Sequence, residues 1–111
     1  MDDLEFEAVV QEALDELPPE FAAGLVNVAV LVEDEYPGEP NLFGLYEGVP
    51  LPERGGGAPG QPDSITIFRR PLERAYRDQA KLREQIRVTV LHELGHHFGI
   101  EEERLDELGY G

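Results

Sequence analysis

The sequence predicts an α+β fold, in which a small sheet of three or four strands packs against helices. Apolar residues recur at helical spacing near the start of the chain and again over a long stretch toward its end. Between them lie three short segments rich in valine, isoleucine and aromatic residues, which is typical of strands. Strands grouped between helices indicate a layer of helices packed on one face of a sheet.

The first helix is predicted over residues 2–17, where the apolar residues form one stripe. Asp2 and Asp3 favour a helix start, because carboxylates accept hydrogen bonds from the first amides. Pro18 cannot continue a helix, since it lacks an amide hydrogen and clashes with the preceding turn. We therefore expect an N-terminal amphipathic helix that ends before this proline.

The three strand segments are predicted at residues 26–32, 42–47 and 64–69. The first is a valine-rich, almost unbroken apolar run, which indicates a buried strand, and the third alternates β-branched residues. Residues 48–63 are rich in glycine and proline and carry no periodicity, so they are predicted to form a loop. Loops of this length in compact domains are usually functional or mobile.

From Pro71 to Phe98 nothing interrupts a helical pattern, and the pattern fits either one long helix or a short helix followed by a long one. Gly99 then stands where a left-handed C-cap ends a helix. Leu105 and Leu108, three residues apart, predict a last short helix.

Length and composition set the class of protein. The chain has 111 residues, which fits a single domain over residues 1–111. It contains no cysteine, so disulfides, thiolate ligands and a cysteine nucleophile are excluded. The acidic start is unlike a signal peptide and no apolar run approaches a membrane span, so we expect a cytoplasmic protein without membrane contact. The net charge of −15 disfavours nucleic acid as a partner.

The chemistry of the chain is concentrated in His92, Glu93 and His96. Residues i and i+4 lie on one face of a helix, so the two imidazoles can share one zinc ion. Glu93 is placed to reach a water molecule on that metal without becoming a ligand itself. A metal that acidifies a water and a carboxylate that takes its proton are what a metal hydrolase needs.

A third ligand is expected from the carboxylates that follow. If the helix continued straight, Glu102 would lie about 9 Å along its axis from His96, which is too far to share a metal. A reversal at Gly99 removes this obstacle. It can return one of the carboxylates to the histidines, and the candidates are Glu101, Glu102, Glu103 and Asp106.

The pattern His92-Glu93-x-x-His96-x-x-Gly99-x-x-Glu102 resembles the extended motif of the metzincins. In that clan the glycine makes a turn and a third ligand follows three residues later, which places Glu102 in that role, with Asp106 as the next candidate. Two features depart from the clan: the third ligand is glutamate instead of histidine, and Met1 is the only methionine, so a methionine turn cannot form. The glutamate ligand of the gluzincins typically lies farther downstream than this chain extends.

The whole chain resembles a group of minimal bacterial zincin-like proteins of little over a hundred residues. Residues 92–99 carry most of the match, and residues 69–73 and 108–110 are also similar. The resemblance implies a zincin-like fold, in which an N-terminal helix and a long helix bearing the motif pack on the sheet. It also implies bound zinc and peptidase activity on peptide or protein substrates.

Three further residues are of interest near the motif. The side chain of His97 points about a third of a turn away from that of His96, so a position at the surface, or one that supports a metal ligand by a hydrogen bond, is more common there than ligation. Tyr46 and Tyr110 could stabilise an oxyanion, although packing is the more common role of a tyrosine.

Two classes of function remain for this motif. The first is a zinc metallopeptidase with Glu93 as general base, whose shallow cleft could be completed by the loop or by a second copy in a homodimer. The alternative is a zinc-binding interaction module without peptidase activity. Glu93 disfavours the alternative, because a structural zinc site needs a fourth ligand and not a base. No residue specifically supports a third reading, an adaptor that acts through its acidic surface.

Overall fold

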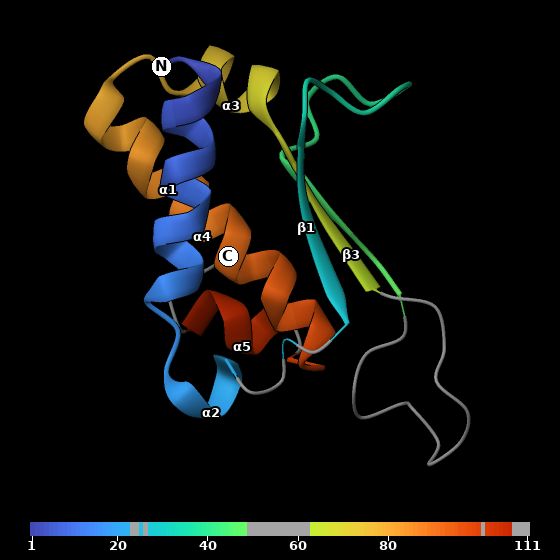
Figure 1. The fold of residues 1–111 in the computed structure, drawn as a ribbon. Helices are drawn as coiled ribbons and strands as arrows, with labels where there is room; N and C mark the ends of the chain where they lie inside the picture. The colour runs from blue at the N-terminus through green and yellow to red at the C-terminus, as the bar shows by residue number, and fades with distance from the viewer. Residues whose placement is uncertain (23–24, 26, 49–62, 101, 108–111) are drawn as a thin grey trace.

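The computed structural model describes residues 1–22, 25, 27–48, 63–100 and 102–107, and within them a three-stranded sheet with helices (Figure 1). The predicted loop over residues 48–63 lies almost wholly outside the described residues, and so does Tyr110. In chain order the elements are α1 (Asp3–Asp15), α2 (Pro19–Ala22), β1 (Val28–Glu33), β2 (Gly44–Glu47), β3 (Asp63–Phe68), α3 (Arg69–Ala75), α4 (Gln79–His97) and α5 (Glu102–Glu107).

The sheet is mixed, with strand order β1-β3-β2. β3 pairs in parallel with β1, where Val28 lies opposite Asp63, and antiparallel with β2, where Gly44 lies opposite Ile67. β3 is therefore the central strand and is buried at five of its six positions. The remaining edges of the described sheet belong to β1 and β2.

The core lies between the sheet and the two longest helices, α1 and α4, which pack against each other on one face of the sheet (Figure 1). Ile65 and Ile67 of β3 are fully buried. The helices bury one stripe each against them, consisting of Phe6, Val9, Val10 and Ala13 of α1 and Leu82, Ile86, Val90 and Leu94 of α4. The predicted arrangement of helices on one face of a small α+β sheet is confirmed.

The helix boundaries follow from local chemistry. The Asp2 side chain caps α1 by accepting a hydrogen bond from the Glu5 amide at 2.8 Å, as the acidic start predicted. Of the two alternatives for residues 71–98, the structure has a short helix followed by a long one. The chain is extended at Tyr76 between α3 and α4, and Asp78 caps α4 through the Lys81 amide at 3.0 Å.

Among the described residues, no helix is long and apolar enough to cross a membrane.

Candidate metal centre

The last turns of α4 carry the motif. The stripe of α4 that includes Leu94 faces the core, and His92 and His96 lie beside this stripe on successive turns. Both histidines are half-buried, so their rings are partly exposed to solvent. The residues between them, Glu93, Leu94 and Gly95, are buried and hold this turn of the helix against the rest of the protein. The core contacts of α4 thus fix the backbone from which the two imidazoles project.

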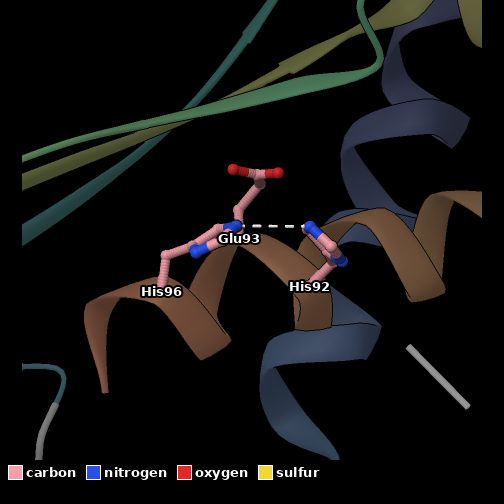
Figure 2. Close-up of side chains that lie close together, drawn as sticks. All are labelled: His92, Glu93 and His96. Atoms are coloured by element: carbon pink, nitrogen blue, oxygen red, sulfur yellow. Dashed lines mark hydrogen bonds between the residues drawn. The ribbon is translucent and has the colours of Figure 1, made fainter. Parts of the chain in front are cut away.

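The two histidines point toward each other (Figure 2). Their Nε2 atoms lie 3.2 Å apart, and their ring centroids are 4.9 Å apart. Two nitrogens that bind one zinc ion tetrahedrally at about 2.0–2.1 Å are about 3.3–3.4 Å apart. The observed separation is close to this value, so the pair can hold a metal ion without moving either helix turn.

Glu93 projects from the same turn of α4 toward the sheet (Figure 2). It is buried, with 8% of its surface exposed. One carboxylate oxygen of Glu93 and one ring nitrogen of each histidine all lie within 4.8 Å of one another. The carboxylate can therefore reach a water molecule on a metal held by His92 and His96.

Gly44, the first residue of β2, lies against this part of α4. A Cβ atom there would come within 2.9 Å of the Thr89 methyl group and 3.0 Å of Glu93 Cγ. Both separations are shorter than normal van der Waals contact, so only glycine lets β2 approach the base of the Glu93 side chain this closely. Gly44 is therefore a point of close approach between β2 and the candidate metal centre.

The turn at Gly99 has the geometry that the motif requires. Gly99 has φ of 76°, and its amide donates to the His96 carbonyl at 3.1 Å. The Ile100 amide donates to the Gly95 carbonyl at 2.8 Å, which completes a Schellman motif. The predicted left-handed C-cap is confirmed at Gly99, three residues after the second histidine.

The predicted third ligand lies in the helix that follows this turn. Glu102 is the first residue of α5 and Asp106 lies one turn later, but their side chains are outside the described part of the structure, as is Glu101. Glu103 is exposed, as expected for a solvated charge.

The structure reveals a buried polar cluster behind the histidines, which we call the Asp63 cluster and which consists of Asp63, His97 and Tyr46. Asp63 Oδ2 lies 2.7 Å from Nδ1 of His97 and accepts a hydrogen bond from the Tyr46 hydroxyl at 2.6 Å. His97 is completely buried and Asp63 is 1% exposed. The cluster joins α4 to the first residue of β3 and to β2.

This cluster shows where the side chains of His97 and Tyr46 lie, two residues whose positions the sequence left open. A surface position for His97 is excluded, because the ring is buried beside Asp63. Tyr46 directs its hydroxyl to Asp63, and its ring stacks on that of His96 with centroids 6.4 Å apart. Sequence reasoning did not single out Asp63. The only signal was an acidic residue at the start of an apolar strand.

A pocket of about 400 Å³ opens beside the histidine pair. His92 and Glu93 form one end of its wall, and the rest comes from preceding turns of α4, from the segment before β2, and from Tyr76. The metal centre is therefore adjacent to a space that can hold part of a ligand.

Comparison with known proteins agrees with this geometry. The model of a family described as zincin-like metallopeptidase matches residues 25–111, which include the sheet, the motif helix and the turn after it. No curated protein matches the chain in sequence. Since the match covers most of the chain, and the structure brings together the two histidines and the glutamate of the motif, the protein belongs to the zincin-like metallopeptidase family.

Proposed function

We propose that this protein is a zinc-dependent peptidase in which His92 and His96 hold the metal and Glu93 is the general base. The observation that carries the proposal is the histidine pair, whose Nε2 atoms are 3.2 Å apart with a buried glutamate beside them. Family membership supports it, because the family is described as metallopeptidase.

When bound, the zinc ion would lower the pKa of a water molecule toward about 7 and polarise the carbonyl group of the scissile bond. Glu93 would take the proton from that water and pass it to the nitrogen of the leaving amine. Its buried position favours this role, because a carboxylate shielded from bulk water interacts strongly with the few groups in front of it. Tyr46 would hold the His96 ring in place by stacking.

We propose Glu102 as the third protein ligand, with Asp106 as the next candidate. The left-handed cap at Gly99 supports this, because such a cap ends α4 and turns the chain away from the helix axis shortly before α5. Three protein ligands would leave a fourth position for water or substrate, as catalytic zinc sites require.

Replacing Gly99 with alanine is expected to weaken zinc binding and to destabilise the protein by about 1–2 kcal/mol. The reason is that its φ of 76° is unfavourable for a residue with a Cβ atom. Gly38→Ala is the matched control, since Gly38 has φ of 85° and open space around its Cβ position. Competition titration with a zinc-binding dye and urea unfolding measure the two effects.

Equal loss of stability in both variants, with zinc affinity lowered only in Gly99→Ala, would support a ligand beyond the turn. Unchanged zinc affinity in Gly99→Ala would contradict it. Glu102→Gln and Asp106→Asn then distinguish the two carboxylates, and we expect the larger loss of affinity in Glu102→Gln.

An extended peptide could bind along β2. Among the described strands β2 pairs only with β3, and we propose its second edge as the place where a peptide adds main-chain hydrogen bonds. Gly44 brings this strand next to Glu93, so a peptide added there would pass close to the histidine pair.

The test is a digest of casein and of a peptide mixture by zinc-loaded protein, by the same protein stripped with a chelator, and by stripped protein to which zinc is restored. We expect cleavage that the chelator abolishes and zinc restores. Stoichiometric zinc without cleavage of any substrate would instead favour the zinc-binding interaction module.

A further inference from the structure

We propose that the pocket beside the metal centre selects peptide substrates by taking up one large apolar side chain, of phenylalanine, leucine or methionine, next to the scissile bond. This inference rests on the proposed peptidase function and adds the class of substrate. It is drawn from the walls of the pocket, from its position and from its size.

The walls of the pocket are largely apolar. Phe43 and Tyr76 form one side, with ring centroids 5.9 Å apart and planes inclined at 56°. Leu42 and Val88 also line it. Thr89 adds a methyl group rather than a polar one, because its hydroxyl donates to the Gln85 carbonyl at 2.7 Å while its Cγ2 faces Gly44.

The position of the pocket ties it to the reaction. His92 and Glu93 belong both to its wall and to the candidate metal centre. A side chain seated between Phe43 and Val88 would therefore belong to a residue whose peptide group lies beside the histidine pair. The pocket would select the residue at the bond that is cleaved, and not a distant one.

The charge of the pocket disfavours ionised side chains. Among the described residues that line the pocket, Glu93 is the single acidic residue, and none is lysine or arginine. An aspartate or glutamate side chain of the substrate would be repelled by Glu93. A lysine or arginine side chain would pair with Glu93 and occupy the base, and either charge would lose part of its hydration beside the apolar walls.

The size suits a large side chain. A cavity of about 150 Å³ is enough for a benzene molecule, and this pocket measures about 400 Å³. It can therefore hold an aromatic ring or a leucine side chain together with the adjoining main chain. An alanine side chain would leave most of the wall in contact with water.

Internally quenched peptides that differ at one position, together with a peptide library read by mass spectrometry, test the preference. We expect the zinc-loaded wild type to favour phenylalanine, leucine or methionine over alanine at one side of the cleaved bond by about tenfold or more in kcat/KM. Val88→Phe, which fills the pocket from the half-buried position of Val88, should lower this ratio at least about tenfold. Leu4→Phe, at an exposed position of α1, is the matched control and should keep the ratio of the wild type.

A second measurement keeps the pocket testable if no peptide is cleaved. In metal-free protein, N-acetyl-phenylalanine amide should shift the methyl NMR signals of Leu42 and Val88 at millimolar concentration, whereas N-acetyl-aspartate amide should not. Shifts without any cleavage would keep the pocket and reject the peptidase. A preference for charged residues, an unchanged ratio in Val88→Phe, or no shift with the phenylalanine probe would overturn the inference about the pocket.

Discussion

Replacing Glu93 with glutamine is expected to lower kcat for peptide hydrolysis by a factor of about 10²–10⁴, the usual contribution of a general base. Glutamine has nearly the same shape but cannot take a proton from water. Because the histidines are unchanged, the variant should still bind zinc as the wild type does. The measurement is steady-state hydrolysis of a quenched peptide by wild type and variant, each loaded with zinc and checked for metal content.

The comparison also guards against a contaminating protease. A contaminant would remain in both preparations, so equal rates in wild type and Glu93→Gln at equal zinc content would contradict the role of Glu93. Glu103→Gln is the matched control, because Glu103 is an exposed carboxylate in α5, and it should keep the wild-type rate.

The second large effect is expected at Asp63. Asp63→Ala should destabilise the protein by about 3–5 kcal/mol, because it removes the carboxylate that accepts hydrogen bonds from completely buried His97 and from the half-buried Tyr46. Small domains have a total stability of about 5–15 kcal/mol, so this loss is a large part of it. Urea unfolding of the metal-free protein measures the change without a contribution from zinc.

If Asp63→Ala does not fold, two milder variants still test the cluster. Tyr46→Phe removes one hydrogen bond to Asp63 and should cost about 1–3 kcal/mol. Asp63→Asn keeps the shape and should cost less than Asp63→Ala. Changes below about 0.5 kcal/mol in both variants would show that the Asp63 cluster does not hold α4 to the sheet.

The local part of the site could be predicted from the sequence. The spacing of His92 and His96 places them on one helix face wherever that helix packs, and Glu93 follows from the same geometry. The turn at Gly99 was also predictable, since a glycine after an apolar helix is the usual signature of a left-handed cap. These features depend on residues within one or two helix turns.

The Asp63 cluster could not be predicted in this way. Asp63 is 34 residues from His97 and 17 from Tyr46, so the contacts arise only from the strand order β1-β3-β2 and from the packing of α4 on it. The pocket has the same origin, because Phe43 precedes β2 and Tyr76 lies in the break between α3 and α4. The sequence allowed either one long helix over residues 71–98 or two helices with a break between them. Helical periodicity alone does not decide between these, because it does not locate an extended residue such as Tyr76.

The central claim is that His92 and His96 hold zinc, and the most direct test is the zinc content and affinity of the purified protein. Wild-type protein dialysed against micromolar zinc should retain one zinc ion per chain, and His96→Ala should retain none under the same conditions while keeping its helical circular dichroism. A wild type that binds no zinc, or a folded His96→Ala variant that binds it with unchanged affinity, would contradict the claim.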